Sequence, residues 1–282
     1  MELGLAVNSK INYNYNSLRL TQSRIDYGML TVPRSLLFLF PNYSADISVF
    51  FNNSKNAQKK KFVVSEKNKE ARIYGLSNWL KINKITPNDE IVIQVIDIKE
   101  LLYRFIIEKK FVQEIIKYEN KLDTVKNEEF ANKYLKKIAD INAVDEYNSS
   151  ISQFIRLSKK GVPDRDLSEI RKNTKKSLVP VHFRVLLENI YKGRCQICNF
   201  SFLKKDGRPY FELHHILPNL AEHPKNICLV CANCHKQFTY AKVEHNFVDG
   251  WLSNVVFNDK NYKVKQIIHS LENINFYKNV YF

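Results

Sequence analysis

Two pairs of cysteines constrain the fold of this chain more than any other feature of its sequence. The first pair stands in Cys195-Gln196-Ile197-Cys198 and the second in Cys231-Ala232-Asn233-Cys234. The chain has 282 residues and only 5 cysteines, and four of them stand in the spacing that tetrahedral zinc sites use. The predicted ligands of a structural Zn²⁺ are therefore Cys195, Cys198, Cys231 and Cys234.

Between and beside these pairs lie polar residues that a zinc scaffold does not need. Glu212-Leu213-His214-His215 comes first, Asn226 follows, and His235 stands directly after the last cysteine. This order resembles the HNH nuclease module, whose ββα-metal fold occurs in colicin DNases, restriction enzymes and homing endonucleases. A module that only binds or folds would keep the cysteines without the histidines. The resemblance therefore favours catalysis.

The resemblance also implies a role for each polar residue. His215 would be the general base, because a neutral imidazole can take a proton from water at physiological pH. Asn226 would brace the loop that orients this base. His214 and His235 would hold a catalytic divalent metal, which can stabilise the leaving oxygen of a phosphodiester. Colicins have a further metal histidine where this chain has Thr239, so Mg²⁺ or Mn²⁺ would be held loosely.

The same resemblance predicts the local secondary structure of the module. Its first strand is expected over Phe200–Leu203, followed by an Asp206-Gly207 turn. A second strand is expected from Tyr210 into the histidine pair, and a helix over Cys231–Tyr240. The fifth cysteine, Cys228, stands in an apolar run and is expected to be buried.

Residues 1 to about 110 are expected to form short strands. Turn-forming segments separate runs of apolar or β-branched residues at a spacing typical of a barrel or sandwich. The runs are Leu18–Leu20, Met29–Val32, Ile47–Phe51, Phe62–Val64 and Ile91–Val95. Short helices are expected at Ser35–Phe40 and Leu76–Lys81.

This order of elements resembles the DNA-binding pseudobarrel of plant B-three transcription factors and of several restriction-enzyme recognition domains. The matching pieces are Thr21-Gln22-Ser23, Leu30-Thr31-Val32-Pro33, Phe40-Pro41, Arg72-Ile73-Tyr74, Trp79-Leu80 and Asn88–Val92. The resemblance implies two arms that grip the major groove, where such polar side chains suit base edges. The candidates are Gln22, Ser23 and Arg24 in the first arm and Lys67, Asn68 and Lys69 in the second. A generic small barrel with solvated surface residues is the alternative.

The middle of the chain has a helical pattern. From Glu108 to about Ser158, apolar residues recur every four positions, as at Phe130, Tyr134 and Ile138, with Ala131 and Leu135 beside them. This segment is either a helical linker between the two modules or a dimer surface. After it, a basic stretch with Arg171 and Lys172 is expected along the DNA backbone, with exposed charge as the alternative. A helix is expected over Pro180–Tyr191.

Composition supports a polyanionic partner. The net charge is +15 and the pI is about 9.4, which suits nucleic acid, although a membrane surface or a ribosomal role would also fit. No apolar run approaches the roughly 20 residues of a membrane span, and no signal-peptide pattern is seen at the start. Cysteines in metal-type pairs favour a reducing cytoplasm.

Together these features predict an α+β chain in three parts. A β-barrel that recognises DNA is expected over 1–110, a helical linker over 111–160, and a zinc-stapled ββα-metal nuclease over 161–282. The predicted function is that of a site-specific double-stranded DNA endonuclease of the type II restriction kind, which leaves 5′-phosphate and 3′-hydroxyl ends. The alternatives are a modification-dependent HNH endonuclease and a non-catalytic zinc-containing DNA-binding regulator. A palindromic target would predict a homodimer.

Overall fold

The computed structural model describes residues 11, 13, 15–65, 70–162 and 179–267. Backbone contacts divide the chain into two compact units. The first unit comprises residues 1–120 and 137–144, and the second comprises residues 121–136 and 145–282. The domain limits predicted from the sequence, at 110 and 160, stay a prediction.

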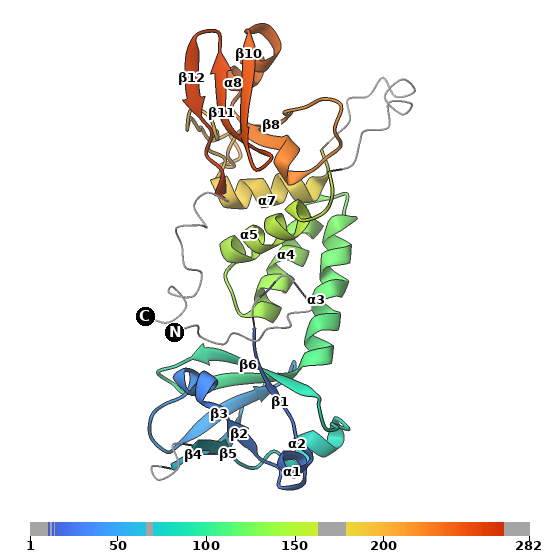
Figure 1. Ribbon diagram of the computed structural model, residues 1–282, viewed down its shortest axis with the longest axis vertical. Coiled ribbons are helices and arrows are strands. Elements are labelled where there is room, and N and C mark those ends of the chain that lie inside the picture. The colour runs from blue at the N-terminus through green and yellow to red at the C-terminus, as the bar shows by residue number, and fades with distance from the viewer. Residues whose placement is uncertain (1–10, 12, 14, 66–69, 163–178, 268–282) are drawn as a thin grey trace. The chain divides into compact units, whose positions relative to one another are not determined.

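The first unit is built on a seven-stranded sheet that curls into a nearly closed barrel (Figure 1). Its strand order is β1-β6-β7-β3-β4-β5-β2. The strands are β1 (Asn16–Arg19), β2 (Leu30–Val32), β3 (Ala45–Phe51), β4 (Gln58–Ser65), β5 (Glu70–Ile73), β6 (Glu90–Asp97) and β7 (Leu102–Ile107). All neighbours pair antiparallel except β3 and β7, which run parallel with Ser48 opposite Leu102. The predicted barrel is confirmed.

Alternation of apolar and polar side chains places the core inside this sheet. Ile47, Val49 and Phe51 of β3 are buried, and the residues between them are less buried, because successive side chains of a strand point to opposite faces. The Phe40 ring stacks on the rings of Phe62 and Tyr103, with centroids 5.2 and 4.8 Å away. Each such buried ring contributes roughly 1.5–3 kcal/mol.

The two short helices predicted in this unit are present. They are the 3₁₀ helix η1 (Arg34–Leu39) and the α-helix α2 (Ser77–Ile82). A further short helix, α1 (Gln22–Asp26), begins after Thr21, whose hydroxyl accepts a hydrogen bond from the Arg24 amide.

The middle of the chain is helical, as its periodicity predicts. The helices are α3 (Glu108–Asp123), α4 (Glu128–Asn142) and α5 (Glu146–Ser158). Within the apolar set predicted for α4, Ala131, Leu135 and Ile138 are buried, while Phe130 is 48% exposed. Among the described residues, none of the helices combines the length and apolar character that a membrane crossing requires.

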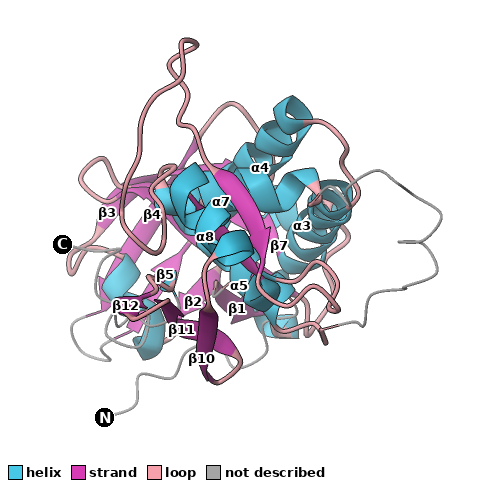
Figure 2. Cartoon of the chain, turned by 90° about the horizontal axis from the view of Figure 1, so that it is seen from above, coloured by secondary structure: helices cyan, strands magenta, loops and turns pink. Residues whose placement is uncertain are grey.

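The second unit carries the cysteine-rich segment on several small elements. Helix α7 (Val181–Tyr191) confirms the helix predicted there and packs against α5. A two-stranded antiparallel ribbon precedes a helix and a three-stranded antiparallel sheet. Figure 2 shows that helix, α8, in cyan and the strands β10, β11 and β12 in magenta. These elements are β8 (Glu212–His215), η2 (Pro224–Asn226), β9 (Ile227–Val230), α8 (Ala232–Tyr240), β10 (Val243–Val248), β11 (Trp251–Phe257) and β12 (Lys260–Lys263).

The strand predicted at Phe200–Leu203 is wrong. That segment makes only an isolated bridge between Leu203 and Pro209. The strand that pairs with the histidine strand β8 is instead β9, with Glu212 opposite Val230 and His215 opposite Ile227. The β9 side chains are all buried, whereas Phe202 and Leu203 remain largely exposed, so burial favours β9 as the second strand.

Candidate active site and metal centre

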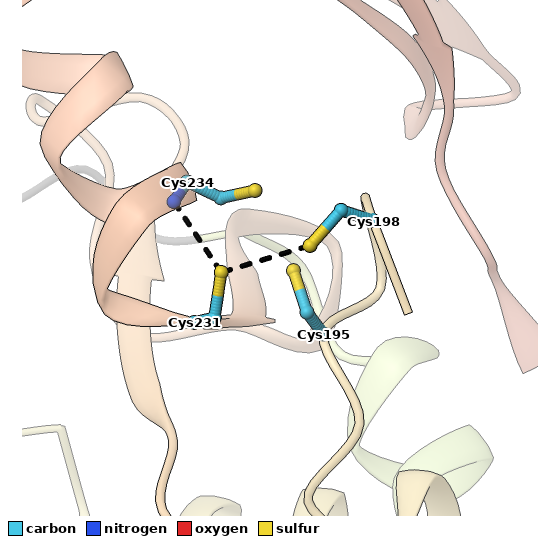
Figure 3. Close-up of side chains that lie close together, drawn as sticks. All are labelled: Cys195, Cys198, Cys231 and Cys234. Atoms are coloured by element: carbon cyan, nitrogen blue, oxygen red, sulfur yellow. Dashed lines mark hydrogen bonds between the residues drawn. The ribbon is translucent and has the colours of Figure 1, made fainter. Parts of the chain in front are cut away.

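The four predicted zinc ligands lie together in the second unit (Figure 3). The sulfur atoms of Cys195, Cys198, Cys231 and Cys234 are all within 4.8 Å of one another, and the Cys198 and Cys231 sulfurs are 3.6 Å apart. Tetrahedral Zn²⁺ with Zn–S bonds near 2.3 Å requires sulfurs about 3.8 Å apart. The cluster therefore fits a structural zinc ion.

The cluster also has the protonation chemistry of a metal site. Cys234 donates a hydrogen bond to the Cys195 sulfur, which lowers the pKa of Cys195 to about 4 and raises the pKa of Cys234. A bound metal ion would displace the remaining thiol protons and would neutralise the repulsion between the negatively charged thiolates. Burial raises the pKa of the Cys228 thiol, and this side chain is fully buried among apolar residues. Cys228 is thus the apolar core residue that its sequence context predicts.

Gln196 fixes the first cysteine pair to the rest of the second unit. Its side-chain oxygen accepts a hydrogen bond from the Leu229 amide at 2.7 Å, and its amide nitrogen donates to the Lys265 carbonyl at 2.8 Å. The Gln196 backbone also bonds to both of these residues. Cys231 begins α8 as its N-cap, and its sulfur accepts a hydrogen bond from the Cys234 amide at 3.4 Å. The zinc ligands therefore lie on ordered backbone.

The two predicted catalytic-metal ligands are neighbours across β8 and α8. The ring centroids of His214 and His235 are 5.1 Å apart in an edge-to-face arrangement. The His214 ring also stacks on Phe238 of α8, with centroids 3.9 Å apart. Burial, helped by nearby histidines, lowers the pKa of His214 to about 3. Its imidazole is therefore neutral at physiological pH, which is the form that binds metals.

Glu212 belongs to the same site, although it was not among the site residues predicted from the sequence. Its carboxylate contacts Nδ1 of His235 and accepts a hydrogen bond from the Tyr210 hydroxyl. The Tyr210 bond is the largest influence that lowers the pKa of Glu212. A carboxylate that holds one nitrogen of an imidazole leaves the other nitrogen for a metal. Strand alternation gives the signal, because Glu212 precedes His214 by two residues.

The predicted general base lies at the end of the same strand. Nε2 of His215 is 3.5 Å from the Glu222 carboxylate. Asn226 ties together the loop that follows, since its side-chain amide nitrogen contacts the carbonyls of Leu217, Leu220 and Ala221 at 3.1 Å each. Its side-chain oxygen accepts a hydrogen bond from the Leu217 amide at 2.8 Å. These contacts set the path of the chain that follows His215.

The two candidate metal sites therefore differ in the number of ligand atoms that the protein brings together. Among the residues that the structure describes, the four cysteines are the only group of at least three candidate ligands whose donor atoms lie within 4.8 Å of one another. His214 and His235 offer two nitrogens, and water or substrate oxygens would complete the coordination of a hard cation such as Mg²⁺.

The predicted DNA-reading residues lie partly within the described structure. Gln22, Ser23 and Arg24 are in α1, where the Gln22 amide bonds to Asp26 at 2.6 Å. The Arg24 guanidinium donates to the carbonyl of Arg19, so it is partly engaged within the protein. The other candidates, Lys67, Asn68, Lys69, Arg171 and Lys172, lie outside the described residues.

Comparison with known proteins agrees with this geometry. The HNH endonuclease family model matches residues 195–240. A stretch of 69 residues is 33% identical to the type IV methyl-directed restriction enzyme EcoKMcrA of Escherichia coli (strain K12). That stretch covers 23% of this chain and 25% of the enzyme, so the match spans about a quarter of this relative's length. The chain therefore contains an HNH endonuclease domain.

Two solved structures also show similarity. The Arabidopsis FUS3–DNA complex is 10% identical with a TM-score of 0.29, over 33% of this chain and 94% of that one. The N-terminal domain of LlaJI.R1 from Helicobacter pylori is 15% identical with a TM-score of 0.26, over 32% of this chain and 78% of that one.

Proposed function

We propose that this protein is a metal-dependent endonuclease that cuts double-stranded DNA at sites selected by its N-terminal barrel, in the manner of a type II restriction enzyme. One observation carries the proposal. The histidines His214, His215 and His235 are all present on the β8–α8 elements of a domain that matches the HNH family. A zinc scaffold alone would need only the cysteines.

The chemistry follows from the contacts of these side chains. His214 and His235 would hold a divalent Mg²⁺ or Mn²⁺ ion, with Glu212 fixing the His235 ring. Such an ion, when bound, stabilises charge on the leaving oxygen of the phosphodiester. His215 would take a proton from the attacking water, and the Glu222 carboxylate 3.5 Å away would stabilise the resulting imidazolium. Asn226 would keep the loop beside His215 in place.

We assign DNA recognition to the first unit. The net charge of +15 of the whole chain suits a polyanion, and within the first unit the exposed helix α1 presents Gln22 and Ser23 at the surface. Lys67, Asn68 and Lys69 are proposed as a second contact with bases, and Arg171 and Lys172 as contacts with phosphates. A symmetric target would require a homodimer. The reduced cysteines that zinc needs are consistent with a cytoplasmic location.

The direct test is incubation of mixed-sequence DNA with the purified protein and Mg²⁺ or Mn²⁺. We expect discrete fragments with 5′-phosphate ends. His215→Ala should lower the cleavage rate by a factor of about 10²–10⁴, the usual contribution of a general base. His182→Asn is the matched control, because His182 lies on α7, outside the β8 and α8 elements that carry the proposed ligands. Salt-dependent binding without cutting on any DNA would instead indicate a regulator.

A second candidate activity is supported by the relative from Escherichia coli, which is methyl-directed. The protein would then cut only DNA that carries modified bases. Digestion of one DNA sequence in modified and unmodified form separates the two activities. Cutting of the modified form alone would identify a modification-dependent enzyme, and cutting of the unmodified form alone would identify a conventional restriction enzyme.

A further inference from the structure

The segment from residue 200 to 210 forms a compact hairpin beside the zinc cluster, which we call the aromatic hairpin. The Lys204 amide donates to the Arg208 carbonyl at 2.8 Å, and the Tyr210 amide donates to the Phe202 carbonyl at 3.0 Å. Gly207 closes the turn with a φ of 76°, a conformation that glycine adopts without strain. The Cys195 amide donates to the Phe200 carbonyl at 3.0 Å and so ties the hairpin to the zinc cluster.

The apolar side chains of this hairpin face solvent. Phe200 is 55% exposed, Phe202 is 47% exposed and Leu203 is 68% exposed. These three lie within four consecutive residues, and the rings of Phe200 and Phe202 are 6.0 Å apart. Contiguous exposed apolar side chains on a rigid element usually mark a surface that contacts another molecule. The exposed residues also explain why this segment adds no strand to a sheet core.

The charges around these side chains indicate an anionic partner. Lys204, Lys205 and Arg208 surround the turn, and Asp206 is the only acidic residue of the hairpin. Asp206 forms ion pairs with Lys204 at 3.3 Å and Arg208 at 3.2 Å, and Arg208 also pairs with Glu128 of α4 at 3.1 Å. These pairs stiffen the turn and leave Lys205 as the cation that pairs with neither carboxylate. Lys205 is exposed. Apolar rings flanked by cations suit a nucleic acid, because the rings can stack on bases while the cations contact phosphates.

A chain of side-chain contacts connects the hairpin to the proposed catalytic metal site. The Phe202 ring stacks on Tyr210, with centroids 5.0 Å apart. The Tyr210 hydroxyl donates to Glu212, and Glu212 contacts Nδ1 of His235. The Phe202 ring is therefore linked to His235 through the side chains of Tyr210 and Glu212. Because the proposed function places DNA at His235, this link favours DNA over other polyanions.

We propose that the aromatic hairpin inserts Phe202 and Leu203 between adjacent base pairs of the DNA next to the cut bond. The inference rests on the proposed nuclease function and adds a base-contacting element outside the barrel. An apolar wedge of this kind unstacks one base step and bends the duplex. The hairpin would thus help to decide which base steps are cut.

The test uses duplexes with 2-aminopurine at each position around the binding site, mapped by footprinting, and the zinc-loaded full-length protein in buffer without Mg²⁺ or Mn²⁺. Unstacking raises the fluorescence of this base, and we expect a rise at one step with the wild-type protein. Phe202→Ala and Leu203→Ala should abolish the rise, and Phe202→Ala should weaken binding about tenfold. Phe247→Ala, which removes a 40% exposed ring of β10, is the matched control and should change neither.

Unchanged fluorescence and affinity in both hairpin variants, with zinc content intact, would overturn the inference. A dimer that Leu203→Ala dissociates, without any fluorescence effect, would also overturn it and would assign the surface to a second copy of the chain. The proposed function is judged separately, because cutting is measured with Mg²⁺ or Mn²⁺. A fluorescence rise that depends on Leu203, in a protein that does not cut, would support the wedge and reject the nuclease.

Discussion

The barrel of the first unit and the cysteine-rich part of the second unit are stabilised by different means. The barrel buries large apolar side chains, among which Phe62, Tyr103 and Phe105 are fully buried. The core beside α8 is made of smaller elements, and its buried residues include Cys195, Cys231 and Cys234. An isolated two-stranded ribbon such as β8–β9 is marginally stable unless other groups hold it in place. We therefore expect only the second unit to require a metal ion for its folding.

Removal of one zinc ligand should have the largest effect on the difference in stability between the two units. Structural zinc contributes roughly 10–16 kcal/mol to the folding of small zinc modules. We therefore expect Cys231→Ser to release zinc and to unfold the second unit while the barrel remains folded. Zinc content and limited proteolysis of the two units measure the outcome. Cys228→Ala is the control that should keep its zinc, and loss of both units together in Cys231→Ser would contradict the comparison.

A change in the barrel core should destabilise the first unit and leave the second unit folded. Phe62→Ala removes a fully buried ring that stacks on Phe40, and it should lower the unfolding free energy of the first unit by about 3–5 kcal/mol. Zinc content should not change. Phe38→Ala, at a residue that is 58% exposed, should cost less than about 0.5 kcal/mol. Denaturant unfolding of both variants checks the difference, which would be absent if the barrel had no core of its own.

A smaller and pH-dependent effect is expected from His182 in the second unit. Burial lowers the pKa of His182 to about 4, whereas an unfolded histidine titrates near 6.5. Protonation therefore favours the unfolded state, so stability is full above pH 6.5 and falls as the pH drops toward 4. The slope from this residue is at most about 1.4 kcal/mol per pH unit.

His182→Asn should remove that part of the slope. Denaturant unfolding of the second unit at pH 7.0 and pH 5.5 compares the variant with the wild type. Equal pH dependence in the two proteins would show that His182 is not buried in its neutral form. Zinc content must be measured in both samples, because thiolate ligands also become protonated as the pH falls.

The sequence predicted the regions whose signals are local. The runs at Ile47–Phe51 and Ile91–Val95 are rich in β-branched and aromatic residues and form β3 and β6. The two cysteine pairs have the Cys-x-x-Cys spacing that is typical of zinc sites, and their four sulfur atoms lie together as predicted. The helix after Cys231 begins at the predicted place because the Cys231 sulfur caps it.

The sequence did not predict features that depend on pairing across a long loop. Residues Phe200–Leu203 have the composition of a strand, yet β8 pairs with β9, which returns only after the loop that Asn226 braces. No turn-forming motif in the sequence indicates that β8 pairs with β9 in this register. Glu212 was missed for a related reason, because its contact with His235 appears only when α8 packs against β8.

The most direct test of the central claim uses the two metal sites together. The protein is exchanged into metal-free buffer, its zinc content is measured, and cutting of DNA is assayed before and after addition of Mg²⁺ or Mn²⁺. The account predicts about one retained zinc ion per chain, no cutting in metal-free buffer, and full cutting once the second metal is added. Cutting at the full rate with the retained zinc alone would contradict the assignment of a separate, loosely held catalytic metal at His214 and His235.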